Sequence, residues 1–270
     1  MRLDDITIVL VRPSEPGNAG AVCRAMKNMG LRWLRTAASE LNLAGPDLEK
    51  LLARAVHAAD IWEGAEHVDT LETALADCAL SAGTTRRRGR HRKSNTLSPR
   101  ELAEFLKIRP GKAAIVFGNE RTGLNGGELE LCNMASHIPV SPEFPSVNLS
   151  HAVQIYAYEL YQALAENGGD AAADGGPAAG GGPGGVSGRW VPMVRDEIDA
   201  QVKTISDSLE ALGFYKHPGK EEQERFLRDL IARAGLGLRE GRYLGNIIVK
   251  AGRLGLLSGR SFAAVPANPD

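Results

Sequence analysis

Residues 117–124 read FGNERTGL and directly follow the apolar run AAIV, placing a carboxylate and an arginine between two glycines. The spacing of Gly118 and Gly123 matches the start of a phosphate-binding P-loop. A P-loop, however, needs a lysine and then a serine or threonine after the second glycine, to reach the phosphates and Mg²⁺. Leu124 and Asn125 stand in those places. The sequence therefore excludes a nucleoside triphosphate site of this type, and the turn must serve another ligand.

Two further polar segments begin at or near the ends of predicted strands. Residues 12–24 read RPSEPGNAGAVCR, and residues 138–150 read IPVSPEFPSVNLS. Ligands bind at the carboxyl ends of the strands in open α/β sheets, so the three segments are candidates for one site. Taken singly, each is also ordinary turn chemistry. Their combination, in this order and with these separations along the sequence, is far more specific evidence for one ligand site.

The composition limits the class of protein. The chain has 270 residues, 43% of them hydrophobic and 24% charged, which is ordinary for a soluble globular protein. No apolar stretch reaches the roughly 18–20 residues that span a bilayer, so no membrane partner is expected. The N-terminus shows neither the basic region nor the cleavage site of a signal peptide. We expect a cytoplasmic protein.

Cysteine and histidine usage argues against a metal site. Cys23, Cys78 and Cys132 are odd in number, widely spaced and without a CxxC pair, so they predict neither a disulfide framework nor bound zinc. His137 and His151 are better explained by solvent or capping roles than by catalysis. No metal is expected.

One short stretch of the chain is strongly basic, although the formal net charge is only −1. Residues 86–93 read RRRGRHRK. Such a run is either a solvated or disordered basic loop or a patch that contacts nucleic-acid phosphates. Composition alone leaves both interpretations open.

Apolar runs and helical periodicity alternate in the first part of the chain, which predicts an α/β fold with a mostly parallel sheet covered on both faces. A capping box at Ser98 with proline at the next position predicts a helix to about residue 106. The predicted strands are 6–11, 31–38, 78–85, 113–118 and 137–140, and the other predicted helices are 18–30, 47–60 and 148–168.

A glycine-rich segment divides the chain. Residues 168–188 hold ten glycines and two prolines, which cannot bury enough apolar surface to offset the entropy of ordering them. We expect domains at 1–167 and 189–270, joined by a flexible linker at 168–188. Apolar residues at helical spacing predict three helices after the linker, forming a small helical module.

The three polar segments together resemble the motifs of the SPOUT methyltransferases, in particular the SpoU-TrmH branch of RNA ribose 2′-O-methyltransferases, over about residues 5–165. The resemblance implies an α/β domain with a C-terminal trefoil knot that binds S-adenosyl-L-methionine and acts as a homodimer. Residues 213–252 resemble the helical extension of the TrmJ-type enzymes. This second resemblance implies tRNA as substrate, with methylation of the ribose at nucleotide 32, a cytidine or a uridine.

The resemblance also assigns site residues. Gly118 would let the backbone approach the cofactor, and Glu120 is expected to hold Arg24 or Asn18 by a charge-assisted hydrogen bond. Catalytic candidates are Asn18, Arg24 and Glu120; cofactor-binding candidates are Thr84, Thr85, Gly118, Ile138, Pro139, Ser146, Val147, Asn148 and Leu149; RNA-binding candidates are Arg86, Arg87, Arg88 and Arg90.

The reaction implied is in-line methyl transfer from the sulfonium to a ribose 2′-oxygen, and no metal is needed for it. Arginine holds its proton too tightly to be a good general base. We therefore expect Arg24 of one subunit to orient the hydroxyl and stabilise its developing charge in the other subunit's site. Whether Arg24 also takes the proton stays open. The alternatives are an enzyme for another tRNA position or for rRNA, and an inactive knotted RNA-binding protein.

Overall fold

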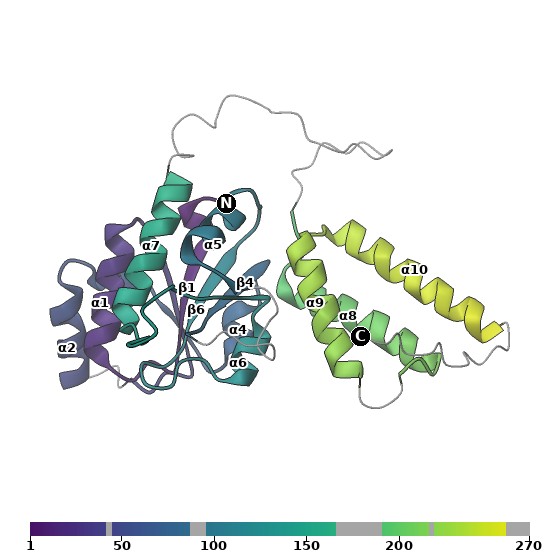
Figure 1. The fold of residues 1–270 in the computed structure, drawn as a ribbon, viewed down its shortest axis with the longest axis horizontal. Helices are drawn as coiled ribbons and strands as arrows, with labels where there is room; N and C mark the ends of the chain where they lie inside the picture. The colour runs from purple at the N-terminus through teal and green to yellow at the C-terminus, as the bar shows by residue number, and fades with distance from the viewer. Residues whose placement is uncertain (42–44, 87–95, 166–190, 216–218, 258–270) are drawn as a thin grey trace, which may run out of the picture. The chain divides into compact units, whose positions relative to one another are not determined.

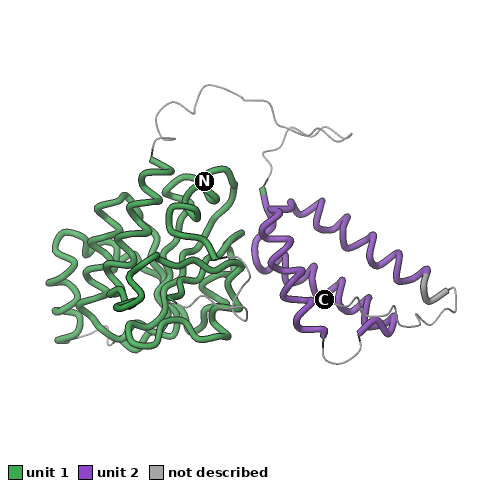
Figure 2. Tube along the Cα trace, viewed as in Figure 1, with its two compact units in different colours: residues 1–191 green, residues 192–270 purple. Residues whose placement is uncertain are grey.

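The computed structural model describes residues 1–41, 45–86, 96–165, 191–215 and 219–257. The chain forms two compact units, residues 1–191 and 192–270 (Figure 2). The predicted linker at 168–188 and most of the basic run, including Arg87, Arg88 and Arg90, lie outside the described residues.

Unit 1 is built on a seven-stranded sheet in which the six pairs of neighbouring strands are parallel (Figure 1). The order is β3-β2-β1-β6-β4-β7-β5, so β6 lies between β1 and β4, although it follows both in sequence. This order brings the carboxyl ends of β1, β6 and β4 side by side. The strands are β1 Ile6–Val11, β2 Trp33–Ala37, β3 Glu66–Val68, β4 Leu80–Thr84, β5 Thr96–Leu97, β6 Ala113–Phe117 and β7 Met134–Ser136.

Helices cover both faces of this sheet. On one face, Val9 and Val116 pack with Leu75 and Leu129 of the short helices α4 and α6 in one apolar cluster. On the other face, α7 contacts α1 and α5, and its Tyr156 meets Phe117 edge to face. The helices are η1 Leu3–Asp5, α1 Pro16–Asn28, α2 Pro46–Ala55, α3 Ala59–Glu63, α4 Leu71–Leu75, α5 Pro99–Lys107, α6 Gly126–Leu131 and α7 Leu149–Ala165.

The structure confirms the α/β class and corrects two predicted elements. The helix predicted over 47–60 is interrupted at Val56, whose φ of 56° is incompatible with a continuing right-handed helix. The strand predicted at 137–140 is wrong, because β7 ends at Ser136. His137 still donates its N–H to the Leu97 carbonyl at 2.9 Å, but Pro139 has no N–H to donate. The chain therefore leaves the sheet before the segment that was expected to extend it.

Unit 2 contains the three helices that periodicity predicts: α8 Arg195–Ala211, α9 Lys220–Ala234 and α10 Leu238–Leu257. α8 contacts both of the others. Its buried Ile198, Val202 and Ile205 form the centre of the unit, and Arg228 of α9 pairs with Asp199. No helix among the described residues of either unit is long and apolar enough to cross a membrane.

Candidate cofactor site

A cavity of about 350 Å³ opens at the carboxyl ends of β4 and β6. Its walls come from the end of β4, the turn after β6 and the segment leading into α7. Most of the residues predicted to bind the cofactor line this cavity, whereas Pro139 and Asn148 are absent from its described lining. The predicted residues found there are Thr84, Thr85, Arg86, Gly118, Glu120, Ile138, Ser146, Val147 and Leu149.

The turn from Gly118 to Gly123 is closed by a backbone contact between its two arms. A Cβ atom on Gly118 would lie 2.1 Å from both the Gly123 carbonyl carbon and the Leu124 nitrogen. Gly123 itself has a φ of 68° and donates its N–H to the Asn119 carbonyl at 2.8 Å. Only glycine fits at Gly118, because a side chain there would force the two arms of the turn apart. The turn keeps its backbone groups at the cavity wall.

Asn119 fixes the shape of this turn from the inside. Its side-chain oxygen accepts the Arg121 N–H at 3.0 Å, and its amide nitrogen donates to the Arg12 carbonyl at 2.8 Å and the Ser14 hydroxyl at 3.2 Å. The residue is 6% exposed. Asn119 thus joins the turn after β6 to the loop after β1, and sequence reasoning did not single it out.

Glu120 has different partners from those predicted. Its carboxylate accepts the Ser14 N–H at 3.2 Å, the Ser14 hydroxyl at 3.1 Å and the Glu15 N–H at 3.2 Å. The expected bond to Arg24 or Asn18 is replaced by these contacts with the loop just before α1. Glu120 therefore orients the start of α1 by binding the backbone N–H groups of Ser14 and Glu15.

Asn18 and Asn148 meet although 130 residues separate them. The Asn148 amide donates to the Asn18 side-chain oxygen at 3.0 Å. The Asn148 oxygen accepts the N–H and hydroxyl of Ser150 at 2.9 and 2.8 Å, which caps the first turn of α7. Asn148 therefore fixes the segment that leads into α7, which lines the cavity, although Asn148 itself is absent from the described lining. Asn18 joins this segment to α1.

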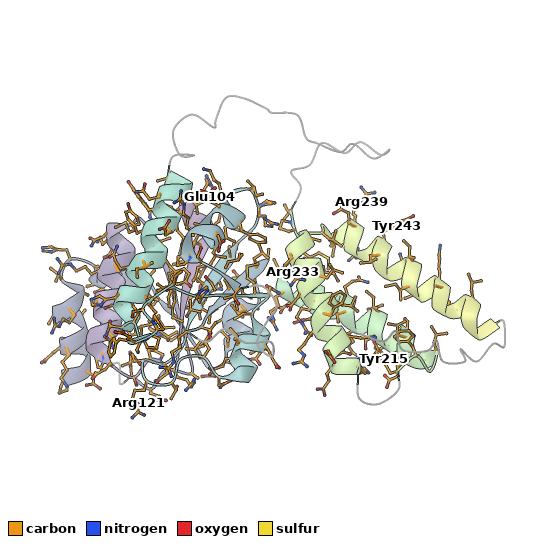
Figure 3. The ribbon with its side chains drawn as sticks, in the orientation of Figure 1. Glu104, Arg121, Tyr215, Arg233, Arg239 and Tyr243 are labelled. Carbon is orange, nitrogen blue, oxygen red and sulfur yellow. The ribbon has the colours of Figure 1, made fainter. Side chains whose placement is uncertain are left out.

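Arg24 is exposed on α1 and is absent from the described residues that line the cavity of its own chain. Arg121 and Arg86, by contrast, are exposed at the cavity lining, and Figure 3 shows Arg121 projecting from unit 1. Arg121 lies inside the sequence FGNERTGL, so its place between two glycines was a signal that could have identified it. Arg86 and Arg121 therefore add positive charge to a lining that also carries the Glu120 carboxylate.

The inner wall is neutral and rigid. The Tyr156 hydroxyl donates to Ser136 Oγ at 2.7 Å, and Ser136 Oγ donates to the Leu97 carbonyl at 2.7 Å. Burial raises the pKa of Tyr156, so its hydroxyl keeps its proton. The Ser136 carbonyl also accepts the Thr85 N–H at 2.9 Å. Ser136 therefore holds together the end of β4, the strand β5 and helix α7.

The donors around the cavity fit an organic cofactor better than a metal ion. Among the described residues, no group of three or more histidine, cysteine, aspartate or glutamate side chains could hold a metal. The wall combines the glycine backbone of the turn after β6, threonine hydroxyls and the apolar Ile138, Val147 and Leu149. Small-molecule pockets typically have this mixture of apolar surface and a few fixed polar groups.

Residues 5–158, more than half of the chain, match the SpoU rRNA Methylase family. The chain belongs to this family. The resemblance drawn from the three polar segments is thereby confirmed, and those segments are the ones that form the cavity and its supports.

Several proteins named as tRNA methyltransferases are similar to this chain. A tRNA (cytidine/uridine/adenosine-2′-O-)-methyltransferase TrmJ of Pseudomonas aeruginosa is 45% identical over 168 residues, which are 60% of this chain and 62% of that protein. The match thus spans less than two thirds of that relative. A tRNA (cytidine/uridine-2′-O-)-methyltransferase TrmJ of Salmonella typhimurium is 37% identical over 241 residues, 86% of this chain and 90% of that protein. The crystal structure of TrmJ from Z. mobilis ZM4 superposes with a TM-score of 0.68 at 28% identity, over 91% of this chain and 98% of that one.

Proposed function

We propose that this SpoU family member is an S-adenosyl-L-methionine-dependent tRNA ribose 2′-O-methyltransferase. The observation that carries the proposal is the cavity at the ends of β4 and β6, whose wall at Gly118 has no room for a side chain. Family membership and the activities for which the TrmJ relatives are named support the reaction and the substrate. The family likewise implies the trefoil knot around this cavity.

The residues of the cavity fit the cofactor. Ile138, Val147 and Leu149 would hold its adenine in an apolar slot, while the backbone at Gly118 and the hydroxyls of Thr84 and Thr85 would bind its polar edges. When bound, the cofactor supplies a methyl group already activated on a sulfonium. Pro139, Ser146 and Asn148 complete the proposed set, Asn148 by fixing the loop through Asn18.

Arg24 has a role at the acceptor. Its planar guanidinium would orient the ribose 2′-hydroxyl and stabilise the negative charge that develops on the oxygen. Because Arg24 does not line the described cavity of its own chain, the proposed active form is a homodimer in which Arg24 reaches the partner's cavity. Asn18 and Glu120 act by placing the helix that carries Arg24.

The proposed target is nucleotide 32 of tRNA, a cytidine or uridine, modified in the cytoplasm. Unit 2 supports RNA binding, because its helix α10 presents exposed Arg239, Arg242, Tyr243 and Lys250. Figure 3 shows Arg239 and Tyr243 projecting from the start of that helix. Arginines and exposed aromatic rings bind phosphates and stack on unpaired bases, respectively.

The full-length protein is expected to transfer labelled methyl groups from S-adenosylmethionine to a tRNA that carries a pyrimidine at nucleotide 32. Mass spectrometry of nuclease fragments then locates the 2′-O-methyl group. Excess EDTA should leave cofactor affinity unchanged in calorimetry, since the described residues hold no cluster of three or more histidine, cysteine, aspartate or glutamate side chains that could bind a metal ion.

The matched control is the same tRNA with a 2′-deoxyribose at nucleotide 32, which lacks the acceptor oxygen. Equal labelling of both tRNAs would show that another nucleotide is the target. Cofactor binding without methylation of tRNA or rRNA would instead favour the inactive RNA-binding protein.

Replacing Arg87, Arg88 and Arg90 by glutamine is expected to weaken tRNA binding and flatten its salt dependence. Each lost phosphate contact removes about one unit from the slope of log K against log salt. Fluorescence anisotropy at several salt concentrations measures both quantities, and calorimetry should show unchanged cofactor affinity.

The control for charge removal replaces Arg2, Arg32 and Lys107. Arg2 and Arg32 precede β1 and β2, and Lys107 ends α5 beside the N-terminus of the chain, so all three lie toward the amino-terminal ends of the strands, opposite the cavity. This variant should bind tRNA with the wild-type slope. If both variants lose the same slope, the effect reflects total charge and not the basic run.

A further inference from the structure

Arg12 lies in the loop between β1 and α1, and its backbone conformation is constrained. It directly follows β1 and has a φ of 51°, a left-handed conformation that residues other than glycine rarely adopt. Its N–H donates to the Ala37 carbonyl at 2.8 Å, and its own carbonyl accepts the Asn119 amide at 2.8 Å. Strained residues of this kind persist where surrounding contacts fix them, and they gather at functional sites.

The Arg12 side chain reaches the turn after β6. Nε donates to Glu128 Oε1 at 2.7 Å, and Nη2 donates both to Glu128 Oε2 at 3.0 Å and to the Gly123 carbonyl at 3.2 Å. The two side chains are 27% and 13% exposed. A two-pronged arginine–carboxylate pair sets direction as well as distance, which a lysine cannot reproduce.

Glu128 connects this pair to the cavity wall. Its Oε2 also accepts the Asn125 N–H at 2.7 Å, and its own N–H donates to the Asn125 side-chain oxygen at 2.9 Å, which forms the capping box of α6. Gly123, Leu124 and Asn125 all line the cavity. The Arg12 guanidinium therefore binds the cavity wall directly, at the Gly123 carbonyl, and indirectly, through Glu128 and Asn125.

The other end of Arg12 leads to α1. Only Pro13 and Ser14 separate it from Glu15, the N-cap of that helix, and Ser14 and Glu15 are the residues that Glu120 holds. The turn after β6 is therefore connected to the loop before α1 at two places. Arg12 makes one connection, through Gly123 and Glu128, and Glu120 makes the other, through Ser14 and Glu15.

We propose that Arg12 is a positioning residue that couples occupation of the cavity to the placement of α1, and hence of Asn18 and Arg24. The proposal rests on the function proposed above. A ligand that contacts the wall at Gly123–Asn125 stabilises the Arg12–Glu128 pair, and the stabilised pair holds the first turn of α1 in the position that places Asn18 and Arg24.

A purely structural ion pair would behave differently, and the chain offers a matched example. Arg35 on β2 binds Asp77 with two prongs, at 2.5 and 3.2 Å, and Glu66 at 2.6 Å, and its side chain is 13% exposed. Neither Arg35 nor these partners belong to the described lining of the cavity. The Arg35→Lys variant therefore measures the general effect of losing a largely buried arginine that binds a carboxylate through two hydrogen bonds.

The test compares Arg12→Lys, Glu128→Gln and Arg35→Lys in the full-length protein. Hydrogen–deuterium exchange with and without saturating S-adenosylmethionine reports on the wall and on residues 14–21. In the wild type and in Arg35→Lys, the cofactor should slow exchange in both regions. In Arg12→Lys and Glu128→Gln, it should still protect the wall but lose most of its protection of residues 14–21.

Single-turnover methylation at saturating cofactor should fall about fivefold or more in Arg12→Lys, the size expected when one link of a coupling network is weakened. The double variant Arg12→Lys/Glu128→Gln should lose no more than either single variant, because both remove the same link. Thermal unfolding confirms that each variant is folded.

Undiminished protection of residues 14–21 in Arg12→Lys would overturn the proposal, as would an equal loss in Arg35→Lys. The exchange measurement needs no RNA. A wild-type protein that transmits the protection but methylates no tRNA would therefore leave the coupling intact and remove the proposed function.

Discussion

The Gly118→Ala variant is expected to lose S-adenosylmethionine binding almost completely. The new Cβ would lie 2.1 Å from the backbone of Gly123 and Leu124, and backbone atoms cannot move aside as a flexible side chain can. Overpacking of this kind typically costs about 1–3 kcal/mol or more. If a cost near the upper end of this range falls on the cofactor-bound turn, the affinity drops by about a hundredfold. Calorimetry measures the loss.

Gly126→Ala is the matched control for this experiment. Gly126 lines the same cavity, and a Cβ built on it meets no atom within 4 Å. This variant should bind the cofactor as the wild type does, and both variants should unfold in a cooperative transition. Wild-type affinity in Gly118→Ala would show that the turn after β6 does not contact the cofactor.

The Arg24→Ala variant is expected to bind S-adenosylmethionine normally and to methylate tRNA about 100- to 1000-fold more slowly, as when one oxyanion-stabilising donor is removed. Affinity should be unchanged because Arg24 is exposed on α1 and lies outside the described cavity lining. Single-turnover rates and calorimetry separate the two quantities. Lys27→Ala, one turn further along α1 and paired with Asp60, is the control for charge loss on this helix.

Mixing the two inactive variants tests the shared site. In a heterodimer of Arg24→Ala with Gly118→Ala chains, one cavity has an intact Gly118 and faces the Arg24 of its partner. That site should recover methylation, giving up to about half of the wild-type rate per heterodimer if the two sites act independently. A heterodimer that forms but stays inactive would show that Arg24 acts within its own chain.

Elements with a strong local signal were predictable from the sequence. The apolar runs of β1 and β6 are buried along their whole length, and the Ser98 capping box begins α5 as expected. The three helices of unit 2 follow their apolar periodicity. Each of these signals lies within a single element, so it needs no knowledge of the surrounding structure.

Short elements were not predictable, and one strand was misplaced. β3, β5, α4 and α6 span two to six residues each, which is too few for a periodic pattern to appear. Tertiary pairing defines the two strands, as β5 exists only through its register with β7. The same pairing ends β7 at Ser136, before the apolar residues that suggested a strand further on.

The sequence by itself determined the residues that form the site and the family: the two glycines of the turn, the three polar segments and the SpoU family to which they point. Only the tertiary structure decided which of these residues meet. Glu120 accepts hydrogen bonds from Ser14 and Glu15. Asn148 donates to Asn18, and Arg12 binds Glu128, which lies 116 residues further along the chain. The reason is physical. A hydrogen bond depends on a separation near 3 Å, and that separation arises only after β6 is inserted beside β1 in register.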